Sequence, residues 1–267
     1  MVTNRQLAHY RTFGFVVLPD LLGPKRTSAL GAEVDAAIRD AYAATYDERI
    51  IDGISGHYLP MASGLTPVSS SLVCDDPILI DAAERLLDEP VLPAPPEGIL
   101  YFSEAGWHND DGIGVRGVKF ATYFDALDSA CGALRFIPCS HHEGSLAEVR
   151  SYLRTIGDDV PGVVATSRPG DVIAFDLHTF HASMGGRDRL AWAIEYVAMA
   201  HDAGEAEKTL QWMADGFEQA FRGFDRARYP VWRDWLTNPN SNPRRAAAID
   251  RLRRAGVLDL AGAELGW

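Results

Sequence analysis

Two histidines and one aspartate have the residue types and the spacing of a metal site. His108 and Asp110 stand two positions apart, and His181 follows much later in the chain. Two imidazoles and one carboxylate are the ligands of a mononuclear non-haem iron site, which leaves coordination positions open for other molecules. Arg189, shortly beyond the second histidine, offers a guanidinium that can hold a carboxylate with two parallel hydrogen bonds. These residues predict an Fe(II) site that also binds a dicarboxylate cosubstrate such as 2-oxoglutarate.

The spacing of the first two ligands fits an extended strand. Side chains alternate between the two faces of a strand, so His108 and Asp110 are expected to project to the same side. Asp111 is a rival carboxylate, but on such a strand it would face away from His108. We therefore expect His108 and Asp110 to be the paired metal ligands.

The third ligand must come from another strand. Residues 171–176 are apolar and follow a Pro-Gly turn, which predicts a short buried strand that ends a few residues before His181. His178 lies in the same interval and competes with His181 for the third position. Arg187 competes in the same way with Arg189.

Lys119 is unusual because it lies within an otherwise apolar strand, residues 118–124. A buried lysine is costly unless a negative group faces it. Strand alternation puts Lys119, Ala121 and Tyr123 on one face. If that face is the interior, Lys119 could meet a carboxylate of 2-oxoglutarate or of the substrate; if it faces outward, Lys119 is an ordinary solvated side chain.

Composition excludes several classes of partner. The chain of 267 residues has 25 basic and 37 acidic residues and a net charge of −12, which argues against binding nucleic acid or an anionic membrane surface. It has three cysteines without a paired CxxC motif, no apolar signal core and no stretch long enough to cross a bilayer. We expect a soluble cytoplasmic protein, a monomer or a homodimer, that acts on a small molecule.

The pattern along the chain predicts one domain, 1–267, with a β core at about 98–200 and a helical C-terminal extension at about 205–267. Predicted strands cover 13–18, 99–104, 117–124, 134–138, 163–166, 172–176 and 190–199. Predicted helices cover 23–46 and 77–87, whereas 50–72 is expected to be a long loop. An aromatic stripe in the extension, Trp212, Phe217, Phe221 and Phe224, with Trp232 and Trp235 beyond it, is expected to pack against the sheet or against another subunit. Many short strands in one domain suggest a closed sandwich or jelly roll.

Several motifs occur in a characteristic order. They are Phe13-Gly14-Phe15-Val16-Val17-Leu18-Pro19, Trp107-His108-Asn109-Asp110, Gly132-Ala133-Leu134-Arg135-Phe136-Ile137-Pro138-Cys139-Ser140-His141, Gly170-Asp171-Val172 and His181-Ala182-Ser183. With these motifs the chain resembles the phytanoyl-CoA dioxygenase-like branch of the Fe(II)- and 2-oxoglutarate-dependent oxygenases over most of residues 10–200. One departure is Cys139, where the family usually has glycine in a Pro-Gly-Ser-His turn.

The resemblance implies a mainly β fold with flanking helices, a double-stranded β-helix of the jelly-roll, cupin-like kind. It implies iron bound by His108, Asp110 and His181, and 2-oxoglutarate bound at its far carboxylate by Arg189 with Ser183. It also implies an oxygenase that hydroxylates or oxidatively cyclises a small molecule and releases succinate and CO2. The aspartate ligand argues against a halogenase, which needs that coordination position open.

The substrate is less defined than the chemistry. An Ala- and Arg-rich composition is typical of high-GC bacteria, in which similar oxygenases tailor natural products, including sugar-containing antibiotics. Antibiotic biosynthesis is therefore the expected setting, and an acyl or phosphonate substrate is the other choice. Two alternatives to the oxygenase remain at this point, a redox-neutral cupin-like metalloenzyme and a non-catalytic jelly-roll ligand-binding module.

Overall fold

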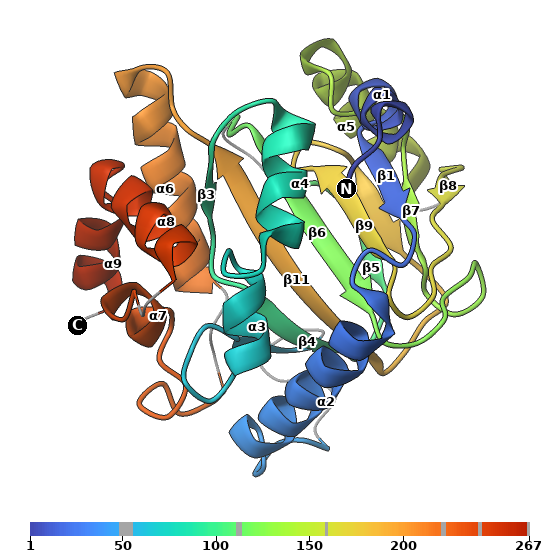
Figure 1. Ribbon diagram of the computed structural model, residues 1–267. Coiled ribbons are helices and arrows are strands. Elements are labelled where there is room, and N and C mark those ends of the chain that lie inside the picture. Colours follow the sequence, from blue (N-terminus) through green and yellow to red (C-terminus); the bar gives the residue numbers. More distant parts are fainter. Residues whose placement is uncertain (48–55, 111–113, 158–159, 220–222, 240–241, 266–267) are drawn as a thin grey trace.

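Two antiparallel sheets form the centre of the molecule (Figure 1). The computed structural model describes residues 1–47, 56–110, 114–157, 160–219, 223–239 and 242–265. The strands are β1 (Phe15–Leu18), β2 (Gly56–Pro60), β3 (Val91–Pro93), β4 (Glu97–Tyr101), β5 (Ala105–His108), β6 (Gly117–Tyr123), β7 (Leu134–Phe136), β8 (Val163–Val164), β9 (Val172–Asp176), β10 (His181–Ser183) and β11 (Arg189–Ala198). The helices are α1 (Asn4–Phe13), α2 (Gly23–Ala41), α3 (Pro67–Leu72), α4 (Pro77–Leu87), α5 (Glu143–Ile156), α6 (Ala203–Gln219), α7 (Arg233–Thr237), α8 (Pro243–Arg254) and α9 (Val257–Leu265).

The larger sheet has the strand order β1-β9-β6-β11-β4-β2, and β3 also pairs with β11. The smaller sheet has the order β5-β10-β7-β8. Pairing of β10 with β5 places His181 opposite His108, so the two histidines that are far apart in sequence become neighbours across one ladder. In the larger sheet, β11 lies between β6 and β4, and Glu195 faces Lys119 across the β11–β6 ladder.

Local signals explain several element boundaries. Thr3 caps α1 and forms a reciprocal capping box with Gln6, and Gly14 ends the same helix in a left-handed conformation with φ of 84°. Asp76 caps α4 through its side chain, which accepts a hydrogen bond from the Ile78 amide at 3.1 Å. Thr3 and Asp76 therefore mark where α1 and α4 begin, and Gly14 marks where the chain leaves α1 and enters β1.

The strand β11 separates two hydrophobic clusters because its side chains alternate. Trp192 and Tyr196 point to the side covered by α2, α3 and α4, where Trp192 donates to Ser69 Oγ at 2.7 Å. Ala191 and Ala193 point to the other side, toward the smaller sheet, and join a cluster that includes Phe136. Because the inward side chains are small, space remains between the two sheets.

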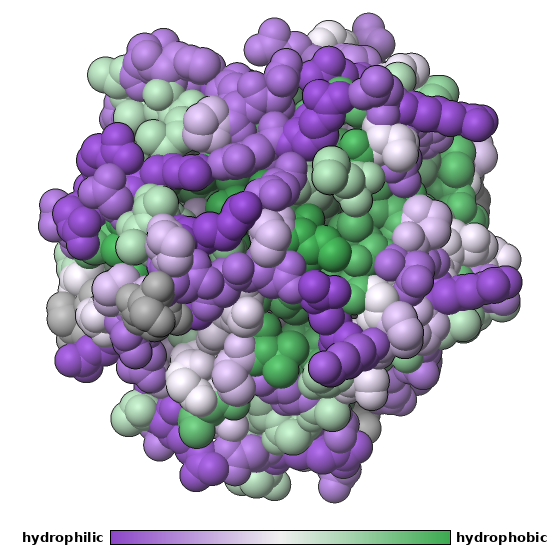
Figure 2. Space-filling model, viewed as in Figure 1, coloured by the Kyte–Doolittle hydropathy of each residue, from purple (hydrophilic) through white to green (hydrophobic). Residues whose placement is uncertain are grey.

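The C-terminal helices pack beside the larger sheet, at the edge formed by β3 (Figure 1). Arg245 on α8 forms a largely buried ion pair with Asp75, and Trp235 donates to the Ser70 carbonyl at 3.0 Å. Trp232 and Trp235 are buried and stack on each other. The predicted positions Phe217 and Phe221 lie outside the described side chains. In the view of Figure 2, hydrophilic side chains predominate over these helices, and hydrophobic ones gather nearer the middle of the face.

Among the described helices, none is both long enough and apolar enough to cross a membrane.

The predicted loop at 50–72 is wrong for most of its described part. Residues 56–60 form β2 and residues 67–72 form α3, whereas 48–55 lie outside the described residues. The strand was missed because both its faces are largely covered, so its sequence has no alternation of polar and apolar residues. The helix predicted for 23–46 ends earlier, at Ala41.

Five further elements have no counterpart in the sequence prediction, namely α1, α5, β3, β5 and β10. The three strands are only three, four and three residues long, too short for a periodic signal. Elsewhere the predicted strands of the core agree with the observed ones to within a few residues, and 172–176 agrees at both ends. The arrangement of two facing antiparallel sheets confirms the predicted mainly β, jelly-roll class.

Candidate metal centre

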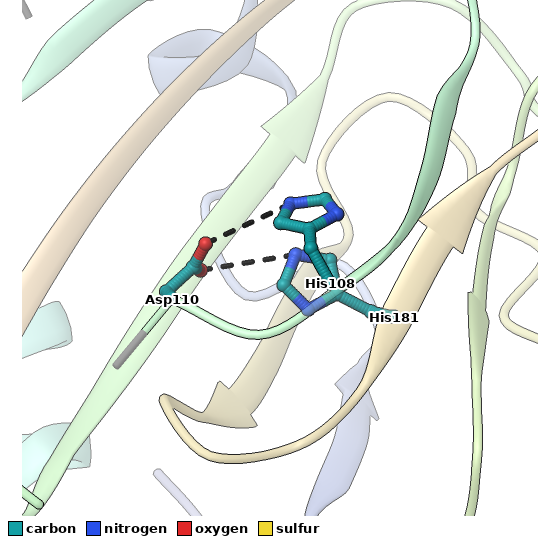
Figure 3. A group of neighbouring side chains, drawn as sticks. All are labelled: His108, Asp110 and His181. Carbon is teal, nitrogen blue, oxygen red and sulfur yellow. Dashed lines mark ion pairs between the residues drawn. The ribbon is translucent and has the colours of Figure 1, made fainter. Parts of the chain in front are cut away.

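Three side chains converge at one end of the smaller sheet (Figure 3). His108 is the last residue of β5, Asp110 follows it, and His181 opens β10. The Nε2 atom of His108 lies 3.8 Å from Asp110 Oδ1, and the Nε2 atom of His181 lies 3.8 Å from Asp110 Oδ2. One ligand atom from each residue lies within 4.8 Å of the others, which is a separation that a single metal ion can span. Among the described residues, this is the group of three His, Cys, Asp or Glu side chains found with such geometry.

Backbone carbonyls orient both imidazoles. His108 Nδ1 lies 2.7 Å from the Gly106 oxygen, and His181 Nδ1 lies 3.0 Å from the Thr179 oxygen. Because a carbonyl oxygen can only accept, each Nδ1 must carry the proton, and in the neutral ring Nε2 then carries the lone pair. Both lone pairs are therefore available on the Asp110 side, as metal coordination requires.

The two paired ligands converge for a different reason from the one predicted. The strand β5 ends at His108, so Asp110 is not on the same strand face but in the bend that follows. Its amide donates to the Leu177 oxygen at 3.0 Å, which ties the bend to the end of β9. The structure thus brings together the two side chains that strand alternation singled out, but for a different reason. The rival Asp111 lies outside the described residues.

The protonation states of the three candidate ligands favour binding of a cation. Burial lowers the pKa of His181 to about 4 in spite of the nearby Asp110, so the imidazole is neutral near pH 7. Burial alone would raise the pKa of Asp110, but the charge of Lys119, with smaller effects from His181 and His108, lowers it to about 2. The His181 side chain is 6% exposed and that of His108 is 48% exposed, so the opening to solvent lies on the His108 side.

Lys119 faces the interior, which decides between the two orientations left open by the sequence. Its Nζ atom lies 2.9 Å from Glu195 Oε1 and 3.2 Å from Asp110 Oδ2. Burial opposes the charge on Lys119, but the carboxylates of Asp110 and Glu195 raise its pKa well above the usual range. The ammonium group therefore links a candidate metal ligand to the larger sheet.

Arg189 is buried at the start of β11, whereas the competing Arg187 is exposed. Its Nη1 atom donates to the Gly132 oxygen at 2.9 Å and closely contacts Ser183 Oγ, and its Nη2 atom donates to the Ser103 oxygen at 2.8 Å. Arg189 Nε is buried without a hydrogen-bond partner. Within the described part of the chain, no carboxylate forms an ion pair with this guanidinium, so its charge has only neutral oxygens around it.

The left-handed turn at Cys139 helps to position His181. Cys139 has φ of 65°, a conformation that glycine adopts without strain, and this agrees with the glycine that the resemblance places there. The next residue, Ser140, accepts a hydrogen bond from the Phe180 amide at 2.9 Å. The turn therefore holds the residue just before His181, as expected for a change that affects a turn and not the chemistry.

The three candidate ligands open into a cavity of about 220 Å³ between the sheets. Its wall includes Lys119, Ser183, Arg189 and Tyr58, and also Glu97 and Tyr101, which the sequence did not single out. Glu195, likewise not singled out, contacts the wall residue Lys119. His178 is not in the metal group; its Nδ1 atom lies 2.9 Å from Asp176 Oδ1. His57, Met61, Phe102 and Trp192 are buried but lie outside this wall.

Glu195 could have been found by the same signal as Lys119. It interrupts the apolar run of β11, and its inward face follows from alternation with Arg189, Ala191 and Ala193. The register that sets Glu195 opposite Lys119 depends on which strands pair, and sequence alone does not supply this. Glu97 stands at the beginning of a strand beside a proline-rich turn and had no such signal.

Comparison with known proteins agrees with this fold and site. Residues 10–187 match the sequence model of the phytanoyl-CoA dioxygenase (PhyH) family. The ectoine dioxygenase of Bordetella parapertussis is 25% identical over 212 residues, which are 67% of this chain and 68% of that protein.

Two solved structures show the same fold at low identity. AviO1 from Streptomyces viridochromogenes Tue57 is 20% identical with a TM-score of 0.59, covering 75% of this chain and 97% of that one. EctD from S. alaskensis, solved with 2-oxoglutarate and 5-hydroxyectoine, is 24% identical with a TM-score of 0.56, covering 74% of this chain and 77% of that one.

A double-stranded β-helix with a His-x-Asp pair and a distant, buried His is the architecture of a non-haem iron dioxygenase. The chain belongs to the phytanoyl-CoA dioxygenase family. The predicted class, a non-haem Fe(II)- and 2-oxoglutarate-dependent dioxygenase, is thereby confirmed. The helices α6 to α9 lie beyond the matched region.

Proposed function

We propose that His108, Asp110 and His181 bind Fe(II), and that Arg189 with Ser183 binds the far carboxylate of 2-oxoglutarate. The observation that carries this proposal is the convergence of two correctly oriented imidazoles and one carboxylate in the wall of a cavity that also contains an uncompensated arginine. A buried guanidinium without an anionic partner is costly, and a bound dicarboxylate would remove that cost.

The donor set fits the metal. Two imidazoles and a carboxylate suit Fe(II), and Asp110 Oδ2 is buried without a hydrogen bond of good geometry although Lys119 Nζ is near. Arg189 Nε is also buried without a partner, so it can donate a hydrogen bond to a bound ligand. When bound, iron with 2-oxoglutarate and oxygen supplies the oxidising chemistry that releases succinate and CO2 and attacks an unactivated C–H bond.

The chain's own residues provide position and shielding. Gly106 and Thr179 carbonyls keep the imidazole lone pairs directed at the metal position, and Lys119 restrains Asp110 through its Oδ2 atom. We propose Lys119 as a second contact for the cosubstrate or substrate, subordinate to its role in positioning Asp110. The apolar wall residues, Ile99, Leu134 and Phe175 among them, limit water in the cavity.

We infer that the substrate is a small molecule of bacterial specialised metabolism, hydroxylated or oxidatively cyclised. Support comes from the fold shared with SnoK, an alpha-ketoglutarate-dependent carbocyclase from nogalamycin biosynthesis, with a TM-score of 0.59. The family match favours this oxygenase over a redox-neutral cupin-like enzyme or a non-catalytic binding module. We further propose that the described chain is one domain, because α7 and α8 pack directly on the residues in and just after α3.

The proposal is tested by adding Fe(II) and 2-oxoglutarate to the metal-free protein without oxygen. We expect a weak visible absorption band from the chelate, and succinate with CO2 after oxygen is admitted. The His108→Ala and His181→Ala variants should lose the band, and Arg189→Gln should need a much higher 2-oxoglutarate concentration to form it.

Two further variants make the assignment specific. His142→Ala, an exposed histidine far from the cavity wall, should keep the band unchanged. His178→Ala tests the rival third ligand. A band that survives in His181→Ala and disappears in His178→Ala would refute the ligand assignment, and no band in the unmodified protein would refute the function.

A further inference from the structure

Glu97 is a carboxylate in the cavity wall for which the described residues provide no counter-charge. It opens β4, and alternation along that strand directs Glu97, Ile99 and Tyr101 to the inner face, where all three line the cavity. Across the ladder it stands opposite Ala193, one inward position away from Glu195. No hydrogen bond or ion pair joins Glu97 to another residue in the part of the chain that the structure describes.

The one nearby ammonium group is already engaged. Lys119 Nζ is within 2.9 Å of Glu195 and within 3.2 Å of Asp110, so its charge is shared by two carboxylates before Glu97 is considered. Burial, with the charges of Glu195 and Asp110, raises the pKa of Glu97 to about 7 in spite of Lys119. The cavity therefore holds this carboxylate at an energetic cost that a bound cation would remove.

Charge balance with the cofactors in place leads to the same residue. A divalent metal and Asp110 leave one positive charge, and Arg189 adds another; together they balance the two carboxylates of 2-oxoglutarate. Lys119 and Glu195 balance each other. Among the described residues of the cavity wall, Glu97 alone remains, so the loaded cavity has room for a single positive charge on its substrate.

The surroundings of Glu97 also suit a cation. Tyr58 on β2 pairs opposite Ile99 and lies on the same inner face, and Tyr101 follows further along β4. Tyrosine ring faces attract positive groups, and Arg189 already lies over the Tyr101 ring at 5.0 Å. Aromatic faces beside an unpaired carboxylate are a common way to bind an ammonium group.

We propose that Glu97 is a specificity-determining residue that binds a positively charged nitrogen, an ammonium or amidinium group, on the substrate. This inference rests on the proposed function, because the charge balance assumes bound Fe(II) and 2-oxoglutarate. It names the substrate class as a monocationic small molecule and places its charged nitrogen at the Glu97 end of the cavity.

The test uses three probes of matched size and different charge, cyclohexylamine, cyclohexanol and cyclohexanecarboxylate. Each is titrated at pH 8 into the anaerobic complex of the protein with Fe(II) and saturating 2-oxoglutarate, and binding is measured by calorimetry and by the change in the visible band. We expect the protonated amine to bind about tenfold or more tightly than the alcohol, and the carboxylate most weakly.

Variants separate a specific role from general electrostatics. Glu97→Gln keeps the shape and should reduce the preference for the amine to about twofold or less, while the band with Fe(II) and 2-oxoglutarate still forms. Glu97→Asp should retain part of the preference. Glu148→Gln, an exposed glutamate on α5, removes the same charge far from the cavity and should leave the preference unchanged.

The outcomes distinguish the two proposals. If the band forms but the alcohol binds as tightly as the amine, or Glu97→Gln keeps the full preference, the inference about Glu97 is overturned and the proposed function stands. If the band never forms in the unmodified protein, the proposed function fails and the inference fails with it.

Discussion

Replacing Lys119 with methionine should destabilise the metal-free protein by about 3 kcal/mol at pH 8. The substitution keeps the aliphatic length but leaves Asp110 and Glu195 without their shared cation, and removing one partner of a buried ion pair costs about 3 to 5 kcal/mol. The pKa of Asp110 gives an independent figure: its fall from 3.8 to about 2 corresponds to about 2.5 kcal/mol, much of it owed to Lys119.

The pH dependence of this loss has a definite sign. A depressed carboxyl pKa stabilises the fold above the unfolded value of 3.8 and loses that effect as pH falls through about 2. Without Lys119 the pKa values of Asp110 and Glu195 should both rise, so near pH 5 the carboxyls can take up protons in place of the lost cation. We therefore expect the loss to be clearly smaller at pH 5 than at pH 8.

Urea unfolding followed by tryptophan fluorescence, on protein treated with a chelator, measures both values. Lys25→Met, at an exposed position on α2, is the matched control and should change the free energy of unfolding by less than about 0.5 kcal/mol. A loss below about 1 kcal/mol for Lys119→Met, or a loss equal at the two pH values, would refute the account of Lys119 as the cation that holds these carboxylates.

Three further substitutions test other parts of the structure. Gly132→Ala should weaken 2-oxoglutarate binding and destabilise the protein by about 1 to 3 kcal/mol. A Cβ at this position would lie 2.8 Å from Arg189 Cδ, and the backbone φ of Gly132 is 87°. Equal 2-oxoglutarate affinity in the variant and the unmodified protein would contradict this prediction. Glu97→Gln should stabilise the metal-free protein by about 2 to 3 kcal/mol at pH 8 and hardly at all at pH 4.5. The reason is that a carboxyl whose pKa is raised from 4.5 to about 7 in the folded protein makes unfolding easier as the pH rises through that window. Urea midpoints at both pH values measure the difference between the two proteins, and a difference that does not depend on pH would argue against this account. Arg245→Ala should lower the free energy of unfolding by about 3 kcal/mol, because it leaves Asp75 buried and unpaired. The C-terminal helices should then be cleaved by a protease before the β core, and unchanged protease resistance would contradict this role of the ion pair.

The chemistry of the site could be predicted from the chain, but much of its geometry could not. Residue types and order pointed to His108, Asp110, His181 and Arg189, because few combinations of side chains suit iron and a dicarboxylate together. The choice between Arg187 and Arg189 needed burial, which depends on how β11 enters the sheet. The reason that Asp110 approaches His108 is a bend tied to Leu177, and no local pattern indicates such a hydrogen bond.

Strand pairing accounts for most of what the sequence did not reveal. Lys119 and Glu195 are each visible as a charged residue in an apolar strand, but the fact that they meet depends on the β11–β6 register. Short strands such as β5 and β10 carry no periodic signal, although they hold two of the three candidate ligands. The long strands and α4, which do carry such a signal, were predicted to within a few residues.

Because the side chains of β11 alternate between the cavity side and the helix side, substitutions at neighbouring positions of this strand should have two different effects. Substitutions at Arg189, Ala191 and Ala193 change the lining of the cavity, and those at Glu195 change the ion pair with the lining residue Lys119. Substitutions at Trp192, Ile194 and Tyr196 change the packing against the helices. In a saturation scan of this strand, with abundance and turnover recorded separately, the two effects should alternate with a period of two. Ala191 and Ala193 would then be the positions at which larger side chains, introduced by design or by evolution, change substrate choice with the least loss of folded protein.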